Sequence, residues 1–204
     1  MKKKFMMFLT FSGLVLFATS CKEHSHTDHS SHEGHGDHLM KAGTASDGSI
    51  YDLDNSWKTQ ENKEVKLSAF KGRPVIISMF YASCESICPR TISNMQGIQK
   101  EAQADDKKPV MIAASFDSKK DTPEALAKYA EKMKLTGDWY LLNGSEDSIR
   151  TLAVVLGINY EQRKDLEFNH SAVISLLNEQ GNVVERIEGL NGSFKPILDT
   201  LKGL

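Results

Sequence analysis

The sequence has few cysteines, no excess of positive charge, and no apolar run long enough to cross a membrane comfortably. Only three cysteines occur in 204 residues, and the formal net charge is -2 at pH 7. A chain without a basic field is not expected to attract nucleic acid. No internal repeat is visible, and an apolar content of 40% is enough for one packed core. The sequence therefore predicts a single globular domain with its thiol chemistry confined to a few positions.

The N-terminus has the pattern of an export signal. Lysines at positions 2–4 precede a short apolar run from Phe5 to Ala18, and small residues follow directly before Cys21. This order is typical of a cleaved secretion signal rather than a membrane helix. Bacterial lipoproteins are acylated on a cysteine at the cleavage point, so we predict a lipoprotein signal peptide at residues 1–20 with lipidation at Cys21. Ordinary secretion with a free Cys21 is the alternative.

Export sets the redox context of the remaining cysteines. The mature protein is expected to be extracytoplasmic, lipid-anchored to a bacterial membrane on its periplasmic side, and monomeric. Thiols tend to be oxidised in that compartment. Once Cys21 is assigned to the anchor, Cys84 and Cys88 are the only thiols left. The pair is then a disulfide, a catalytic dithiol or a metal site.

A polar segment at residues 21–48 separates the signal from the rest of the chain. It lacks apolar periodicity, which is typical of a flexible tether. Neutral imidazole binds copper, zinc and nickel, and closely spaced copies raise the local ligand concentration, so the segment has the pattern of a weak metal-capturing arm. A solvated linker with a biased composition is the alternative. Six of the seven histidines lie in it: His24, His26, His29, His32, His35 and His38.

From residue 49 to residue 204 the pattern predicts an α/β domain. Its order is strand, helix, strand, helix, then a hairpin and a closing helix, which is the thioredoxin-like order with extra elements inserted. We therefore expect a central mixed sheet flanked by helices. The predicted strands are 75–80, 110–116, 139–142, 172–177 and 183–187, and helices are expected to start near Pro89, Pro123, Ser145 and Phe194.

Cys84 and Cys88 are predicted to lie in the loop between the first buried strand and the helix that starts near Pro89. A helix N-terminus offers unpaired N–H groups and a partial positive charge, which favour thiolate over thiol. The C-x-x-x-C spacing is one residue longer than that of thioredoxin-type reductants, and the wider bite favours a shared soft metal ion. A disulfide is also compatible with this spacing.

His170 is the only histidine outside the polar segment. It precedes the strand expected at 172–177, which should run antiparallel to the first two strands and start at the edge where they finish. His170 is thus expected beside Cys84. Two thiolates and one imidazole suit copper(I), imidazole also tolerates copper(II), and zinc would require a fourth ligand. Asp117 should lie at the same edge, where it could tune His170 or contact a partner.

Three blocks of the sequence resemble the SCO/SenC family, which comprises assembly factors for the copper centre of cytochrome c oxidase. The first runs from Tyr81 to Pro89, the second from Ser115 to Glu124, and the third is Asn169-His170-Ser171-Ala172. The similarity extends from about residue 51 to residue 204. It implies a thioredoxin-like fold, a copper site made of Cys84, Cys88 and His170, and membrane anchoring.

Two functions from different classes are compatible with these residues. The first is a copper chaperone that delivers its metal to the apo copper-centre subunit of cytochrome c oxidase or to another cuproprotein. The second is a membrane-anchored thiol–disulfide oxidoreductase, in which Cys84 attacks and Cys88 resolves the mixed disulfide. His170 favours the chaperone, because disulfide exchange has little need of a third ligand. A peroxiredoxin-like peroxidase would need a threonine just before Cys84, which this sequence lacks.

Overall fold

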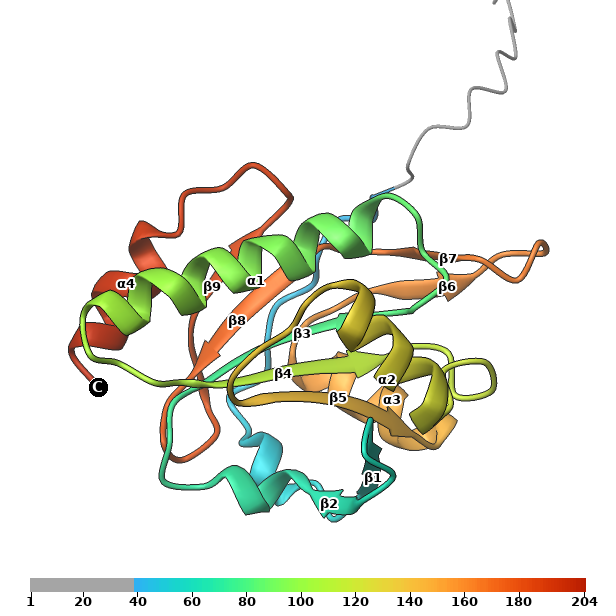
Figure 1. The fold of residues 1–204 in the computed structure, drawn as a ribbon, viewed down its shortest axis with the longest axis horizontal. Helices are drawn as coiled ribbons and strands as arrows, with labels where there is room; N and C mark the ends of the chain where they lie inside the picture. Colours follow the sequence, from blue (N-terminus) through green and yellow to red (C-terminus); the bar gives the residue numbers. More distant parts are fainter. Residues whose placement is uncertain (1–38) are drawn as a thin grey trace, which may run out of the picture. The chain divides into compact units, whose positions relative to one another are not determined.

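The computed structural model describes residues 39–204, which fold around a mixed sheet flanked by helices (Figure 1). Within these residues, seven strands form one sheet in the order β2-β1-β5-β4-β3-β8-β9, and β6 pairs with β7 in a separate hairpin. In chain order the elements are η1 (Ile50–Asp52), β1 (Ser56–Thr59), β2 (Glu64–Lys66), η2 (Leu67–Phe70), β3 (Val75–Phe80), α1 (Ile87–Ala104), β4 (Val110–Ser115), α2 (Pro123–Lys132), β5 (Trp139–Gly144), α3 (Glu146–Val155), β6 (Tyr160–Gln162), β7 (Phe168–His170), β8 (Val173–Leu177), β9 (Val183–Glu188) and α4 (Lys195–Lys202).

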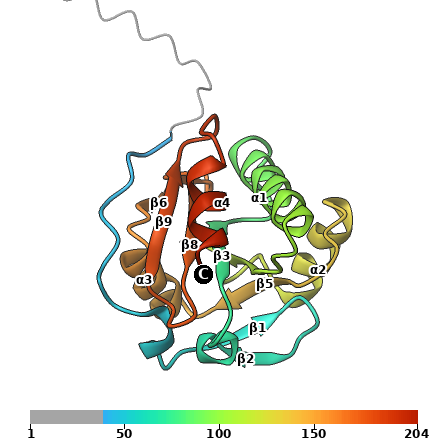
Figure 2. The same ribbon diagram turned by 90° about the vertical axis from the view of Figure 1, so that its left-hand side faces the viewer.

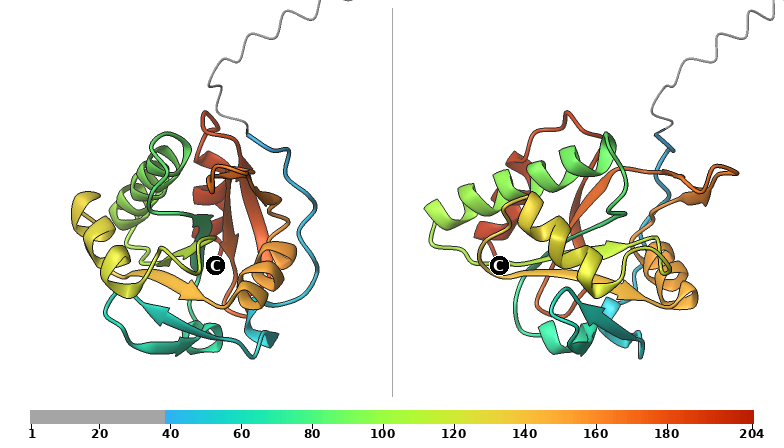
Figure 3. Two further views of the ribbon diagram at one scale, coloured as in Figure 1. Left: turned by 90° about the vertical axis from the view of Figure 1, so that its right-hand side faces the viewer. Right: turned by 45° about the vertical axis from the view of Figure 1, so that its right-hand side comes forward.

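The predicted thioredoxin-like architecture is confirmed. Helices α1, α2 and α4 cover one face of the sheet and α3 covers the other (Figure 2 and Figure 3). Every residue of β3, β4 and β8 is buried. Central strands that are covered on both faces have continuous apolar runs instead of alternation, and this is why the sequence revealed them.

The strand directions bring three chain segments to one edge of the sheet. Strand β3 pairs with β4 in parallel and with β8 in antiparallel orientation. The ends of β3 and β4 therefore lie at the same edge as the start of β8. The segments that follow β3 and β4, and the segment that precedes β8, carry the candidate site residues.

Helix α1 begins earlier than the sequence predicted. Its first residue is Ile87, so Cys88 lies in the first helical turn and only Cys84 lies in the loop. The expectation that both cysteines precede the helix is therefore wrong for Cys88. Pro89 is the third residue of the helix. Proline is tolerated there as well as at the first position, because the N–H groups of the whole first turn lack partners within the helix.

Residues 39–46 form an extended segment along the domain surface, which we call the strap (Figure 2). Its backbone N–H groups donate to the domain at Met40, Gly43 and Ser46, whose acceptors are the carbonyls of His170, Gly157 and Val155. The prediction of a tether extending to residue 48 is therefore corrected for the described part. Composition could not reveal these contacts, because backbone groups supply them.

The strap approaches the domain closely at Gly157, just after α3. A Cβ atom at this position would lie 2.6 Å from the backbone nitrogen of Ala45 and 2.7 Å from the carbonyl oxygen of Gly43. The φ angle of Gly157 is also positive, at 62°, as is usual for a glycine that ends a helix. Both requirements favour glycine here.

Among the described residues, no helix combines the length and apolar character needed to cross a membrane.

Candidate metal centre

Cys84 lies in the loop that connects β3 to α1, and its sulfur occupies the position of a helix cap. The backbone N–H of Cys88 donates to Cys84 Sγ over 3.3 Å. Helix N-terminal N–H groups usually find a serine, threonine or aspartate oxygen, and here a sulfur takes that role. The loop is closed by the Cys84 N–H, which donates to the Tyr81 carbonyl over 3.2 Å. The helix start therefore fixes Cys84 Sγ directly over the first turn.

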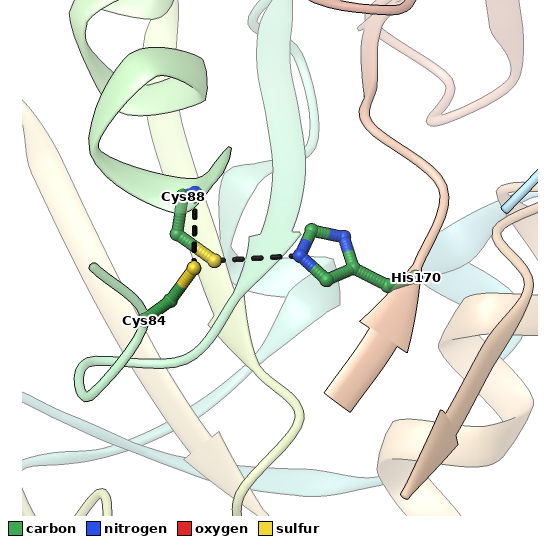
Figure 4. A group of neighbouring side chains, drawn as sticks. All are labelled: Cys84, Cys88 and His170. Atoms are coloured by element: carbon green, nitrogen blue, oxygen red, sulfur yellow. Dashed lines mark hydrogen bonds between the residues drawn. The ribbon is translucent and has the colours of Figure 1, made fainter. Parts of the chain in front are cut away.

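Cys88 and His170 meet across the sheet edge (Figure 4). The distance between Cys88 Sγ and His170 Nε2 is 3.5 Å, and His170 Nδ1 lies 3.0 Å from the Ser171 carbonyl oxygen. Because a carbonyl only accepts, Nδ1 carries the proton of the neutral ring. Nε2 then presents its lone pair to the thiols. This arrangement is the usual way in which a second contact orients a metal-binding histidine.

The pKa values of the two cysteines are shifted in opposite directions. Donation from the Cys88 thiol lowers the pKa of Cys84 to about 3, assisted by the backbone N–H groups of Cys88 and Ser86, against the opposing effect of burial. Burial raises the pKa of Cys88 above its usual value, and the hydrogen bond to Cys84 adds to the rise. The pair therefore holds one thiolate and one thiol near neutral pH, as expected for a reactive or metal-binding dithiol.

The ligand atoms of Cys84, Cys88 and His170 all lie within 4.8 Å of one another, and all three side chains are buried. Two sulfurs and one imidazole nitrogen form a soft donor set that suits copper(I). Among the described residues, no other histidine, cysteine or acidic side chain joins this group. A closed zinc site would need a fourth such ligand, so the donor set fits copper better than zinc.

Aromatic rings surround His170 and close the site on the side of the β6–β7 hairpin. The ring centroid of Phe116 lies 5.1 Å from that of His170, and Tyr81 meets His170 edge-on at 6.1 Å. The hydroxyl of Tyr81 donates to Glu167 Oε2 over 2.8 Å, which links the cysteine loop to the hairpin. These rings limit access of water and restrict rotation of the imidazole.

Asp117 lies just after β4, as predicted, and its carboxylate closes a turn. Its Oδ1 accepts the backbone N–H groups of Lys119 and Lys120 over 3.1 and 2.9 Å. The residue of this block that lies against His170 is Phe116. Asp117 also lines a surface cavity of about 260 Å³ together with Phe116 and Tyr160. Its predicted role in tuning His170 or contacting a partner stays a prediction.

Asp121 was not singled out from the sequence, yet its carboxylate supports the cysteine loop. Oδ2 accepts the Ala82 N–H over 2.9 Å and the Ser115 hydroxyl over 2.5 Å, and the side chain is buried. Burial raises the pKa of Asp121. The carboxylate thus ties the loop before Cys84 to the end of β4. Its place in the second sequence block was a signal, but nothing local distinguished it from Asp117.

The remaining predicted site residues lie outside the described part of the chain. They are the lipidation site Cys21 and the histidines His24, His26, His29, His32, His35 and His38. Their assignments stay predictions.

Comparison with known proteins gives a consistent result. A sequence profile of the SCO1/SenC family matches residues 45–204. The SCO1 protein homolog of Bacillus subtilis strain 168 is 26% identical over 152 residues, which cover 72% of this chain and 79% of the relative.

Solved structures share the fold at lower identity. A SCO1/SenC family lipoprotein from Bacillus anthracis strain Ames superposes with a TM-score of 0.70 at 22% identity, covering 79% of this chain and 99% of the other. ScoI of Arabidopsis thaliana with copper bound gives a TM-score of 0.62 at 21% identity, covering 73% and 91% of the two chains.

Proposed function

This chain belongs to the SCO1/SenC family, and on that premise we propose that it is a copper chaperone. Cys84, Cys88 and His170 bind copper, and the metal is then handed by ligand exchange to the apo copper-centre subunit of cytochrome c oxidase or to a similar cuproprotein. The observation that carries the proposal is the convergence of two sulfurs and one imidazole nitrogen within 4.8 Å. The copper-bound relative from Arabidopsis thaliana supports the choice of metal.

The geometry gives each ligand a separate part. Cys84, with its lowered pKa, offers a thiolate before any metal arrives. Cys88 must lose its proton as the metal binds. His170 presents Nε2, because Nδ1 is held by the Ser171 carbonyl. A three-ligand site leaves copper(I) open to a donor from a recipient, and that opening is what transfer by ligand exchange requires.

Anaerobic copper(I) titration of the reduced protein tests the proposed site. The tract histidines would bind copper themselves, so all six are changed to serine in the full chain. Deleting residues 1–48 instead would also remove the strap. We expect one tightly held copper per chain, and we expect His170→Ala to weaken binding at least tenfold. Unchanged affinity in that variant would rule out the three-ligand site. Transfer is followed by mixing the loaded protein with an apo copper-centre subunit.

A second function, thiol–disulfide exchange, is favoured by the low pKa of Cys84. In that role the Cys84 thiolate attacks a disulfide of the partner, and Cys88 then displaces the partner thiolate and leaves a disulfide in this chain. A reductase assay on insulin or on an oxidised partner separates the two functions. Cys84→Ser abolishes both of them, whereas His170→Ala impairs copper binding and spares disulfide exchange.

We also propose that the chain is lipid-anchored through Cys21 on the extracytoplasmic side of a bacterial membrane. The signal pattern of residues 1–20 supports this, and a structural relative is itself described as a lipoprotein. Cys21→Ser should move the protein from the membrane fraction to the soluble exported fraction. Retention of that variant in the membrane would contradict the lipid anchor.

A further inference from the structure

The backbone of His170 is held between two chain segments. On one side, β6 pairs with β7, and Tyr160 lies opposite His170 in the antiparallel register. On the other side, Leu39 of the strap forms a parallel bridge with His170, and the Met40 N–H donates to the His170 carbonyl over 3.0 Å. The strap is therefore a direct backbone partner of one of the three proposed ligands.

The direction of the imidazole depends on this backbone. His170 Nδ1 contacts the carbonyl oxygen of Ser171, the next residue along the chain, over 3.0 Å. The conformation of these two residues thus decides where Nε2 points, and Nε2 lies 3.5 Å from Cys88 Sγ (Figure 4). Whatever fixes the backbone at His170 therefore also fixes the distance between the imidazole and this sulfur.

The two cysteines are positioned differently. Cys88 lies in the first turn of α1, which has 18 residues, and the Cys88 N–H holds the sulfur of Cys84. His170 instead ends a strand of three residues in the separate β6–β7 hairpin. A two-stranded hairpin is at best marginally stable by itself. Among the three proposed ligands, His170 is thus the one whose position depends most on an added partner.

Asn159 connects the strap to the same stretch of backbone. Its side-chain Nδ2 donates to the Lys41 carbonyl over 2.8 Å. Its own N–H donates to Ser171 Oγ over 2.8 Å, and its carbonyl accepts the Ser171 N–H over 2.9 Å. One residue therefore holds the strap with its side chain and the segment after His170 with its backbone.

The strap lies on the surface and is held mainly by hydrogen bonds. No residue from 39 to 46 is buried, and the side chain of Leu39 is 44% exposed. Segments with few buried apolar contacts open at a lower free energy than the core of a protein. We therefore expect the strap to leave and rejoin the domain while the sheet and its helices stay intact.

We propose that the strap is a positioning element for His170, and that its detachment weakens copper binding because this one ligand is then held less firmly. The inference rests on the proposed copper-binding function. When the strap detaches, the bond between copper(I) and Nε2 breaks more readily, the two sulfurs keep the ion, and no proton or electron moves. The coordination position that opens is then available to a donor from the recipient.

Met40→Pro tests the direct contact, because proline has no N–H to donate to the His170 carbonyl. Lys41→Pro is the matched control. It imposes the same restriction on φ, and within the described residues the Lys41 N–H donates no hydrogen bond. Both changes are made in a parent chain whose six tract histidines are changed to serine, so that His170 is the only histidine.

Copper(I) affinity is measured anaerobically by competition with a chelator. Met40→Pro should lower the affinity several-fold, and Lys41→Pro should leave it close to that of the parent chain. In the His170→Ala background, Met40→Pro should have no further effect, because the strap acts only through the imidazole. A general loss of stability would lower the affinity in both backgrounds.

A measurement on the metal-free reduced protein reports the imidazole itself. Long-range ¹H–¹⁵N NMR of the single histidine should show the Nδ1–H tautomer in the parent chain and a mixture of both tautomers in Met40→Pro. Asn159→Ala removes the side-chain contact to the strap, spares the backbone contacts to Ser171, and should change both readouts in the same direction. Asn94→Ala removes a similar hydrogen bond, to the Leu190 carbonyl, and should change neither.

Equal copper affinity in Met40→Pro and Lys41→Pro would overturn the inference, and so would an equal loss of affinity when His170 is already alanine. Failure of the proposed function gives a different result, since the parent chain itself would then hold no copper(I).

Discussion

At the residue scale, Cys84 combines two tasks that usually fall to different side chains. Its sulfur accepts the Cys88 N–H at the start of α1 and so acts as a helix cap. The hydrogen bond from the Cys88 thiol contributes most to the lowered pKa of Cys84, and the Cys88 N–H stabilises the same thiolate. Because the capping group is a thiolate, protonation of Cys84 should weaken the hydrogen bond at the start of α1. Loss of that hydrogen bond should in turn raise the pKa of Cys84.

The lowered pKa of Cys84 predicts a specific pH dependence. A group with a depressed folded-state pKa contributes its full stability above the unfolded value of about 8.5 and loses that contribution as pH falls toward the folded value of about 3. In a Cys21→Ser, Cys88→Ser chain, Cys84 is the only remaining thiol. Its ultraviolet thiolate absorbance should disappear well below pH 8.5, because the backbone donors at the start of α1 remain. Titration at the ordinary value would contradict the role of the helix start.

Asp121 gives a second residue-scale prediction, which separates its hydrogen bonds from its charge. Asp121→Ala leaves the Ala82 N–H and the Ser115 hydroxyl without their acceptor in a buried place, and should lower the free energy of unfolding by about 2 kcal/mol or more. Asp121→Asn keeps an accepting oxygen and should cost less. Chemical denaturation measures both values.

The charge of Asp121 is one of the groups that raise the pKa of Cys88. Asp121→Asn should therefore move the titration of Cys88 to lower pH, and it should do so without the loss of stability seen in Asp121→Ala. If both variants destabilised the fold equally, the carboxylate would be needed for its charge and not for its accepting oxygens.

At the element scale, the strap depends on the absence of a side chain at Gly157. Gly157→Ala would place a Cβ against the backbone of Gly43 and Ala45 in addition to straining a positive φ. We expect the strap to detach, and the amides of Met40 and Gly43 to lose protection from hydrogen exchange. Gly189→Ala is the matched control, because Gly189 also has a positive φ, but a Cβ added there would meet no atom within 4 Å. It should be strained to a similar degree and leave the strap attached.

The elements that the sequence predicted and those it did not differ in what forms them. Strands β3, β4 and β8 are continuous apolar runs, and the helices carry recognisable starts such as Thr122-Pro123 and Ser145. Strands β6 and β7 have three residues each, and the strap is held mainly through its backbone. Such segments have no hydrophobic period, so the sequence does not indicate them. Their contacts form only in the folded chain.

The same distinction applies to the candidate site. Cys84, Cys88 and His170 could be proposed as metal ligands from the sequence because their chemistry is unusual and because the antiparallel direction of β8 fixes the edge at which His170 lies. Asp121 and Phe116 were missed, since a buried acid and a ring beside the imidazole are defined by contacts between distant segments. The candidate ligands can be proposed from the sequence, whereas the groups that hold them are defined by tertiary packing.

At the scale of the whole molecule, the three proposed ligands come from parts of the chain that are far apart in sequence. Cys84 belongs to the loop after β3, Cys88 to α1, and His170 to β7, which adjoins the strap and β6. A metal ion bound to all three would therefore connect the β3 loop and α1 to β7. An ion that binds the folded chain and not the unfolded one raises stability in proportion to the logarithm of its concentration over its dissociation constant.

Copper should accordingly stabilise the fold as a unit. At a hundredfold excess over the dissociation constant the gain is about 2.7 kcal/mol, which for a chain of this size corresponds to a rise in melting temperature of roughly 5–10 °C. Anaerobic scanning calorimetry of the reduced chain, with and without copper(I), measures the shift. The chain lacking the six tract histidines should show the full effect and His170→Ala a smaller one. Equal shifts in wild type and His170→Ala would mean that copper does not bridge α1 and β7, whatever its affinity for the thiols.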